Sequence, residues 1–304
     1  MSGLTRRRAL FIAAAATAMP LFGRAGPAAE ARWQGTALGA HAEMRIRDLD
    51  AAEAAPIFAA VEAELARLER IFSLYKSDSA ISTLNATGRL QDPPPELLEV
   101  LGLAGAVHAE TGGLFDPSVQ PLFALYAEAG AAGRPVMEND LQAIARVVDF
   151  QSVTFDASAV EFKRAGMGLT LNGVAQGYVT DRIAALLRRE GLSNVLVDIG
   201  EIAATGTGAE GQGWPVRIAN GGPRLRLSDR AVATSMPLGT RLYALENIGH
   251  IFHPSRGWIV PQHRQVSVVA ETAALADALS TAAVLMPDEA LDVLRRRGFE
   301  IFGV

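Results

Sequence analysis

The sequence contains no cysteine. This absence excludes disulfide bonds, thiolate metal sites, a cysteine nucleophile and a lipid anchor attached through cysteine. The five histidines never occur in the His-Glu-x-x-His spacing that places two ligands on one helix face, which argues against a zinc hydrolase. Ser235 has no Gly-x-Ser-x-Gly motif around it, so a Ser-His-Asp hydrolase is also disfavoured.

Positive charge is not in excess. The chain has 28 Lys and Arg residues against 33 Asp and Glu residues, a formal net charge of −5, and no basic stripe. Such a chain is a poor nucleic-acid binder, and we expect no nucleic-acid partner. The apolar run Ala9–Met19 is too short to span a bilayer as a permanent anchor, so we expect no stable membrane anchor.

The N-terminus has the pattern of a targeting segment. Three arginines, Arg6–Arg8, precede the apolar run, and Ala29–Ala31 offers small residues for a signal peptidase. The arginines predict a twin-arginine signal peptide over residues 1–31 and export to the periplasm, with an ordinary Sec signal as the alternative. Its removal takes away four arginines and one glutamate, which changes the net charge from −5 to −8.

The remaining residues, 32–304, predict helices and strands without strict alternation. This mixture favours an α+β fold over a doubly wound one. The stretch 205–223 is rich in glycine and is typical of a loop region rather than a domain boundary. Helices are expected at about 50–71, 79–84, 95–112, 172–190, 273–285 and 290–297, and strands at 33–47, 153–155, 160–162, 195–199, 216–218, 225–227, 231–234, 265–269 and 300–302.

Asp277 and Thr281 are candidate metal ligands. They lie four residues apart in an Ala/Leu-rich segment, so they share one face of a helix that should be buried. A buried carboxylate needs a partner or a metal, and these two oxygens would suit Mg²⁺. The alternative is structural: Asp277 is hydrogen-bonded near a helix start, and Thr281 bonds back to its own helix.

Other segments carry weaker signals. The glycines of Thr170–Asp181 precede a helix and could let backbone amides face a pyrophosphate, although tight packing explains them equally well. Tyr75 could stack on a flat ring, with a core aromatic beside a capped turn as the alternative. Leu114–Asp116 forms a loop fixed by neighbouring glycines and prolines. His250 is a candidate acid or base, although a packed histidine is the simpler interpretation.

Taken in order, these segments resemble the ApbE family of FAD:protein FMN transferases. The resemblance spans about residues 33–302 and rests on seven motifs: Phe72–Asn85, Thr111–Leu122, Leu171–Asp181, Val195–Gly200, Ala233–Ser235, His250–Gly257 and Ala276–Thr281. It implies a single ApbE-like, T-fold-related mixed-sheet domain with flanking helices. It also implies a Mg²⁺-dependent enzyme that transfers FMN from FAD to a Thr or Ser hydroxyl of an acceptor flavoprotein and releases AMP.

The resemblance also implies roles for individual residues. Asp277 and Thr281 match the metal ligands, with a backbone carbonyl near Gly173 completing the site, and His250 and Asp277 are the candidate catalytic residues. The positions that correspond to FAD contacts are Leu38, Tyr75, Leu114, Phe115, Asp116, Thr170, Asn172, Gln176, Ser235, His250 and Ile251.

Some positions depart from the family pattern. Gln176 replaces a usual Lys or Glu, and Glu201 replaces the second glycine of a usual Gly-Gly pair. The Asn-Gly-x-Ala-Gln-Gly-Tyr variant at Asn172–Tyr178, together with the predicted signal, resembles the NosX branch linked to nitrous oxide reductase maturation, which would make the membrane flavoprotein NosR the acceptor. The departures leave two alternatives: an FAD-binding carrier without transfer activity, and an FAD pyrophosphatase.

Overall fold

The computed structural model describes residues 30–208, 211–243 and 247–303. The predicted signal peptide, residues 1–31, therefore lies outside the described residues except for Glu30 and Ala31. These two residues open the first strand, where the Glu30 carboxylate forms an ion pair with Arg45 at 2.9 Å. The position of the signal boundary stays a prediction.

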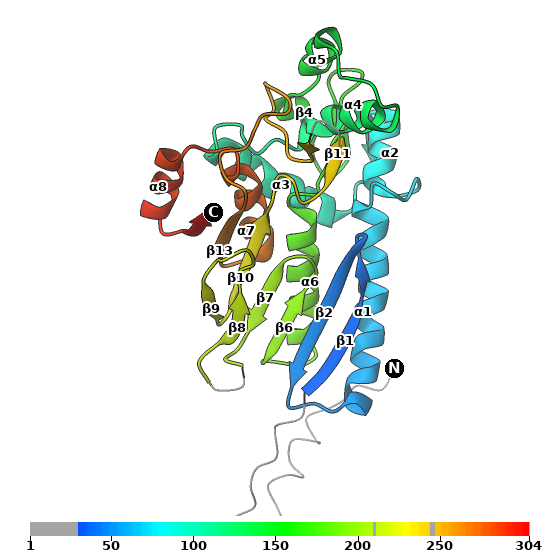
Figure 1. The fold of residues 1–304 in the computed structure, drawn as a ribbon. Coiled ribbons are helices and arrows are strands. Elements are labelled where there is room, and N and C mark those ends of the chain that lie inside the picture. The colour runs from blue at the N-terminus through cyan, green and yellow to red at the C-terminus, as the bar shows by residue number, and fades with distance from the viewer. Residues whose placement is uncertain (1–29, 209–210, 244–246, 304) are drawn as a thin grey trace, which may run out of the picture.

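The central element is a seven-stranded sheet of the described residues, in the order β1-β2-β6-β7-β10-β13-β14 (Figure 1). The α+β class is confirmed. Every neighbouring pair runs antiparallel rather than mixed in direction, because hairpins join β1 to β2 and β6 to β7 while the long connections return in the opposite sense. The strands are β1 (Glu30–Ala37), β2 (Ala40–Arg47), β6 (Val195–Asp198), β7 (Ile202–Thr205), β10 (Arg230–Ser235), β13 (Val266–Ala270) and β14 (Glu300–Gly303).

Helices cover one face of this sheet. The long helix α1 (Ala51–Phe72) begins as its sequence predicts: the Asp50 carboxylate accepts from the Ala52 and Glu53 amides, and the Glu53 carboxylate accepts from the Asp50 amide. Helices α6 (Ala175–Arg189) and α7 (Ala273–Ala283) share this face, and α3 (Pro95–Glu110) packs against α1 and α7 (Figure 1).

Helices α6 and α7 cross in direct backbone contact. A Cβ atom on Gly177 would lie 2.3 Å from the Ala273 carbonyl oxygen, so only glycine permits this approach. The half-buried Asp181 carboxylate of α6 accepts from the Ala273 and Ala274 amides at 2.8 and 2.9 Å, which satisfies two amides of the first turn of α7. Helix α6 therefore fixes where α7 begins.

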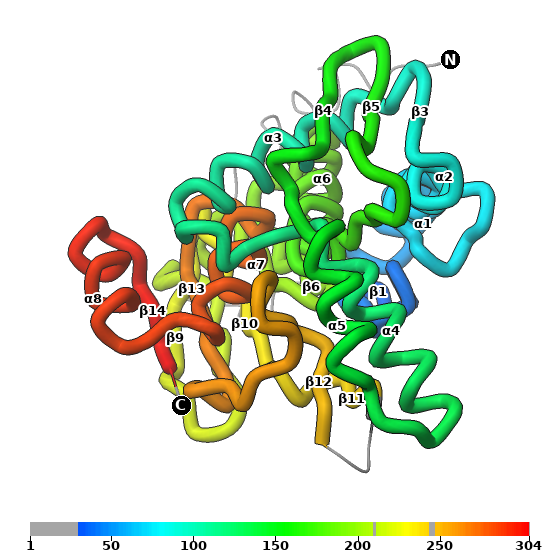
Figure 2. The backbone as a smooth tube through the Cα atoms, turned by 90° about the horizontal axis from the view of Figure 1, so that it is seen from above, coloured from blue at the N-terminus to red at the C-terminus, as the bar shows by residue number. Residues whose placement is uncertain are grey.

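The other face is covered in part by the hairpin of β8 (Trp214–Arg217) and β9 (Arg224–Leu227). The Trp214 ring is 1% exposed and packs with Val232 and Val269 of the sheet, so this face has its own small core. Figure 2 shows β11 (Arg241–Tyr243) and β12 (Ile248–Gly249) beside α4 (Gln120–Ala131) and α5 (Glu138–Ala145), away from the main sheet. The other elements are α2 (Ala80–Thr87), α8 (Asp288–Arg296), β3 (Arg89–Gln91), β4 (Val153–Phe155), β5 (Ala159–Phe162) and the 3₁₀ turns η1 (Pro117–Val119) and η2 (Phe150–Ser152).

Most expected elements are confirmed with small shifts of their ends. The strand expected at 216–218, within the glycine-rich stretch 205–223, is β8 at Trp214–Arg217, which begins two residues earlier. Strand β7 and helices α4 and α5 are additions that the sequence patterns do not predict. Helix α5 has no fully buried residue, so its sequence lacks the strong apolar pattern that predicts a helix. Among the described residues, no helix is long and apolar enough to cross a membrane.

We predict that Gly177→Ala disrupts the α6–α7 crossing. The added methyl would overlap the Ala273 carbonyl, and we expect the free energy of unfolding to fall by about 3 kcal/mol. Gly102→Ala is the matched control, because a Cβ atom added to this helical glycine of α3 would have no other atom within 4 Å. Urea denaturation should show the control unchanged or stabilised by about 0.5–1 kcal/mol. Equal midpoints for Gly177→Ala and the parent chain would contradict the contact.

Candidate active site

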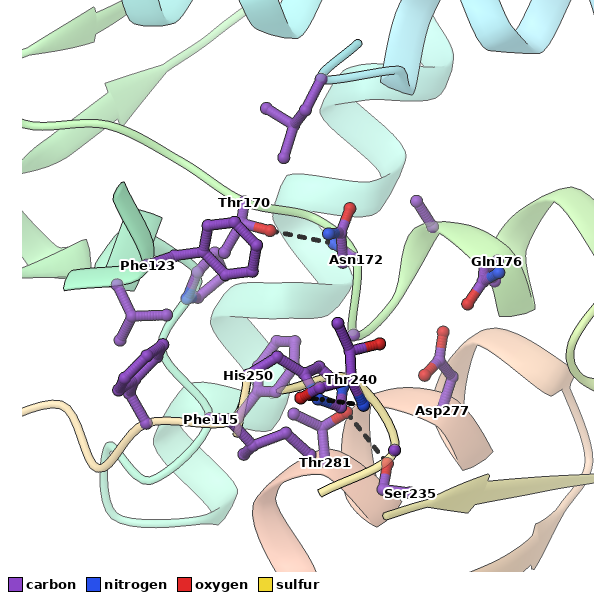
Figure 3. A pocket seen from close by; sticks show the side chains of 18 of the residues that line it. Phe115, Phe123, Thr170, Asn172, Gln176, Ser235, Thr240, His250, Asp277 and Thr281 are labelled. Carbon is purple, nitrogen blue, oxygen red and sulfur yellow. Dashed lines mark hydrogen bonds between the residues drawn. The ribbon is translucent and has the colours of Figure 1, made fainter. Parts of the chain in front are cut away.

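A cavity of about 350 Å³ opens where the loops after α1 and α3, the start of α6, the end of β10 and helix α7 meet. Figure 3 shows Gln176 and Asp277 on one side of the pocket and Phe123 on the other. The structure brings every sequence-predicted site residue to the lining of this one cavity. These residues are Leu38, Tyr75, Leu114, Phe115, Asp116, Thr170, Asn172, Gly173, Gln176, Ser235, His250, Ile251, Asp277 and Thr281.

Asp277 lies at the α6–α7 crossing. Its side chain is 3% exposed, and the Oδ2 atom accepts a hydrogen bond from the Gly177 amide at 3.1 Å. Thr272, not Asp277, caps α7, and the hydrogen bond of Asp277 goes to the first turn of α6 instead. Burial raises the pKa of this carboxyl to about 8, and the charge of Asp181 adds to the effect. A carboxylate held here would be stabilised by a bound cation.

Thr281 lies one turn further along α7. Its hydroxyl is 3.3 Å from the Ser235 hydroxyl of β10, which in turn is 2.8 Å from the Ser280 hydroxyl. A Cβ atom on Gly173 would lie 2.7 Å from the Thr281 Oγ1 atom, so the backbone before α6 approaches this hydroxyl closely. The Asp277 carboxyl, the Thr281 hydroxyl and the Gly173 backbone thus line the same side of the cavity, and oxygen donors of these kinds fit Mg²⁺.

Glu201 also lines the cavity, although the sequence marks it only as a departure from the family pattern. It is 7% exposed, and its Oε2 atom accepts from the Thr234 amide at 3.2 Å. Burial raises its pKa well above the usual value, and the charge of Asp277 raises it further. A glutamate directly after a buried strand and a Gly turn is the one local signal that could have identified it.

The acidic side chains of the cavity are not balanced by a lysine or arginine side chain of the described residues. Three carboxylates line the pocket, those of Asp116, Glu201 and Asp277, and no lysine or arginine of the described residues lines it. Within the described ranges, no group of three or more histidine, aspartate and glutamate side chains could hold a metal alone. A cation here would therefore need hydroxyl, carbonyl, water or phosphate oxygens as well.

The start of α6 is only partly open to an anion. The Val174 and Ala175 amides both donate to the Leu171 carbonyl, and the Gly177 amide donates to Asp277. These three amides are engaged within the protein and do not face a ligand, whereas contact of other backbone amides of Thr170–Asp181 with a pyrophosphate stays a prediction. The Gln176 side chain lies over Gly200, where a Cβ atom would be 3.0 Å from its Nε2 atom.

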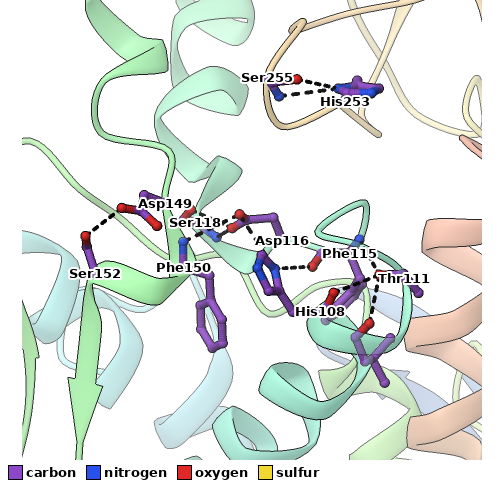
Figure 4. Close-up of polar contacts among 11 residues, drawn as sticks. His108, Thr111, Phe115, Asp116, Ser118, Asp149, Phe150, Ser152, His253 and Ser255 are labelled. Atoms are coloured by element: carbon purple, nitrogen blue, oxygen red, sulfur yellow. Dashed lines mark hydrogen bonds and ion pairs between the residues drawn. The ribbon is translucent and has the colours of Figure 1, made fainter.

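The loop Leu114–Pro117 is held by a polar network (Figure 4). Asp116 Oδ1 accepts from the Ser118 amide and hydroxyl at 2.8 and 2.5 Å, and the His108 Nδ1 atom lies 2.9 Å from the Phe115 carbonyl. Burial raises the pKa of Asp116, while the Ser118 hydrogen bonds oppose the rise. Asp116 is predicted from the sequence but His108 is not, because this histidine comes from an ordinary helical pattern in α3.

Tyr75 and Leu38 stand at the edge of the cavity. The Tyr75 ring is 84% exposed, whereas ordinary aromatic side chains prefer burial. The Leu38 amide donates to Glu69 at 3.0 Å, and Glu69 also pairs with Lys76 at 2.6 Å, which ties the β1–β2 turn to the segment after α1. An exposed ring on a fixed segment is suited to stacking on a flat ligand.

His250 faces the cavity from the end of β12. Its Nδ1 atom lies 3.3 Å from the Thr240 carbonyl and 3.4 Å from the Thr240 amide, an arrangement that orients the ring (Figure 3). Burial lowers the pKa of the imidazole below its usual value, so the neutral form dominates at pH 7. A neutral imidazole can accept a proton.

Comparison with known proteins agrees with this geometry. The chain matches the ApbE family over residues 38–302, and it belongs to that family. It is 29% identical over 291 residues to the FAD:protein FMN transferase of Klebsiella pneumoniae (strain 342), covering 88% of this chain and 82% of that protein. The Escherichia coli K12 protein of the same name is 27% identical over 292 residues, with the same coverage.

Solved structures show the same fold. The apo form of the Pseudomonas stutzeri flavinyl transferase ApbE superimposes with a TM-score of 0.78 at 26% identity, covering 94% of both chains. The flavin transferase ApbE from Vibrio cholerae gives a TM-score of 0.78 at 22% identity, covering 91% of this chain and 94% of that one. The family and its fold are therefore established for this chain, while the roles of the individual site residues stay predictions.

We predict that Asp277→Asn stabilises the metal-free protein at pH 8. The pKa of Asp277 rises from 3.8 to about 8 on folding, so burial penalises the folded state increasingly between about pH 4 and pH 8. Asparagine removes that penalty and keeps an oxygen for the Gly177 amide. We expect the Tm at pH 8 to rise by roughly 4–8 °C, the shift for about 2 kcal/mol, and the difference to shrink at pH 5. A variant that melts at or below the parent temperature at pH 8 would refute this assignment.

Proposed function

We propose that this chain is an FAD:protein FMN transferase that needs a divalent cation, Mg²⁺ in the first instance. The observation that carries the proposal is that Asp277, Thr281 and the Gly173 backbone lie together at the lining of a cavity that also offers apolar and aromatic surfaces. The names of its curated relatives support the same activity.

The proposed substrate is FAD, and its central pyrophosphate and its two terminal ring systems need different surroundings. The pyrophosphate belongs beside the oxygen donors, where the cation, when bound, would neutralise its negative charge. The isoalloxazine and adenine rings need flat apolar contacts, which Tyr75, Leu114 and Ile251 supply at the lining. Thr170, Asn172, Gln176 and Ser235 offer hydrogen bonds to the polar parts in between.

The proposed chemistry is an attack by an acceptor hydroxyl on the FMN phosphorus. The acceptor Thr or Ser oxygen forms a new P–O bond, the pyrophosphate P–O bond breaks, and AMP leaves with the bridging oxygen. The hydroxyl proton needs a base. His250 suits this role because burial keeps its imidazole neutral, and a cavity aspartate is the other candidate. The chain's own contribution is to hold both reactants in line and to accept the proton.

The cellular setting is part of the proposal. Arg6–Arg8 and the following apolar run support export by the twin-arginine route to the periplasm. The acceptor would then be a periplasm-facing flavoprotein. The Asn172–Tyr178 motif with Gln176 and the predicted signal resemble the NosX branch, so NosR is the first acceptor to test.

The decisive experiment is a transfer assay. The purified chain is incubated with FAD, MgCl₂ and an acceptor domain, and the acceptor mass is read by mass spectrometry together with flavin fluorescence in the gel. The proposal predicts acceptor carrying one FMN and an equal amount of AMP, none on an acceptor whose target Thr is replaced by Ala, and none with Asp277→Ala. Free FMN with AMP would indicate a pyrophosphatase, and intact co-purified FAD would indicate a carrier.

Tyr75 allows a separate prediction about FAD binding. Since the ring is 84% exposed, Tyr75→Ala should leave the free energy of unfolding within about 0.5 kcal/mol of the parent value. Losing one stacked ring should raise the Kd for FAD by roughly 3- to 10-fold, whereas Tyr75→Phe should retain most of the affinity. Titration by flavin fluorescence measures both. Equal Kd values for parent and Tyr75→Ala would show that FAD does not stack on this ring.

A further inference from the structure

The charges that line the cavity do not balance for a pyrophosphate substrate. The lining formed by the described residues contains the carboxylates of Asp116, Glu201 and Asp277 and no lysine or arginine, and burial keeps His250 neutral. A pyrophosphate adds about two more negative charges. A bound cation would supply the positive charge that no lining lysine or arginine supplies, and the question is which side chains would hold it.

The turn that joins β6 to β7 places Glu201 where its side chain could hold a cation. Gly200 has φ +87°, a conformation that favours glycine, and the Ile199 amide bonds to the Glu201 carbonyl. The turn delivers the Glu201 side chain into the cavity, where Oε2 accepts from the Thr234 amide at 3.2 Å. The Oε1 atom has no hydrogen-bond partner among the described residues.

Glu201 and Asp277 approach the end of β10 from two directions. Glu201 bonds to the Thr234 amide, and the adjacent Ser235 hydroxyl lies within 3.3 Å of Thr281 on the same helical face as Asp277. Both carboxyl groups line the same cavity, and their partners Thr234 and Ser235 are neighbours on β10. Each is almost fully buried, and one backbone amide is the only hydrogen-bond donor to each within the part of the chain that the structure describes.

We propose that Glu201 is a further ligand, directly or through one water molecule, of the proposed divalent cation. The other ligands of this cation are Asp277, Thr281 and the Gly173 carbonyl. With Glu201 in the site, the chain binds the cation before it binds FAD. The inference rests on the metal site of the proposed function and extends it. Two carboxylates balance a doubly charged cation completely. A site with Asp277 alone would keep one positive charge and would depend on the pyrophosphate to hold the metal.

This assignment predicts two opposite effects of removing the Glu201 charge. Cation binding should weaken because a ligand charge is lost. FAD binding at saturating cation should strengthen, because the loaded site becomes more positive by one charge and its ligand is an anion. A purely structural role for Glu201 would weaken both.

The test measures Mn²⁺ binding to the FAD-free chain by electron paramagnetic resonance or calorimetry at pH 8. Glu201→Gln should raise the Kd for Mn²⁺ by roughly 10- to 100-fold, and Glu201→Asp, which keeps the charge, should show a smaller loss. Asp198→Asn is the matched control: Asp198 is the neighbouring acid, bonded to the Gly200 amide, and it does not line the cavity. Its Kd should stay within about twofold of the parent value.

FAD is then titrated at a Mn²⁺ concentration that saturates each variant. The Kd for FAD of Glu201→Gln should fall by roughly threefold or more. Unchanged Mn²⁺ affinity in Glu201→Gln, with the affinity lost in Asp277→Asn, would overturn the proposal and identify Glu201 as a protonated structural side chain. Absence of Mn²⁺ binding by the parent chain would also overturn it.

These outcomes are independent of the transfer reaction. If the parent chain transfers FMN but Glu201→Gln binds Mn²⁺ with the same Kd as the parent chain, the inference fails and the proposed function stands. If Mn²⁺ binding depends on Glu201 but no acceptor is labelled, the metal site stands and the proposed transferase activity fails.

Discussion

The contact between Gly177 of α6 and Asp277 of α7 positions the rest of the candidate site. Glycine lets the two helix backbones touch, and its amide is the hydrogen-bond donor that holds the buried Asp277 carboxylate. Asp181 fixes the start of α7 from the same side, so Thr281, one turn beyond Asp277, reaches Ser235 and the Gly173 backbone. The proposed cation site is therefore a consequence of how these helices cross on an antiparallel sheet, because neither helix carries enough ligands alone.

Local signals in the sequence predict most of the fold. The Asp50 capping box, the proline at the start of α3 and the glycine after α6 place the helix ends to within a few residues. The elements that escape prediction lack such signals. Strand β7, Ile202–Thr205, is four residues long and follows a turn at Gly200, and helix α5 has no fully buried residue. The antiparallel direction of the whole sheet depends on long connections that no local pattern encodes.

The residues of the candidate site also fall into those that the sequence predicts and those that it does not. Residues within recognisable motifs, such as Tyr75, Phe115 and Asp277, are predictable and line one cavity. Glu201 and His108 are not, because their roles arise from the folded arrangement: Glu201 bonds to Thr234, 33 residues away. Tight packing, rather than contact with a phosphate, is the better explanation of Gly177, which touches Ala273 across the helix crossing.

The measurement that tests the central claim most directly is a crystal structure of this chain with MgCl₂ and FAD. The account predicts one cation with ligand oxygens from Asp277, Thr281 and the Gly173 carbonyl at about 2.0–2.1 Å, in contact with the pyrophosphate, and the flavin ring inside the cavity near Tyr75. FAD bound elsewhere, or a pyrophosphate that lies away from Asp277 with no cation between them, would contradict it.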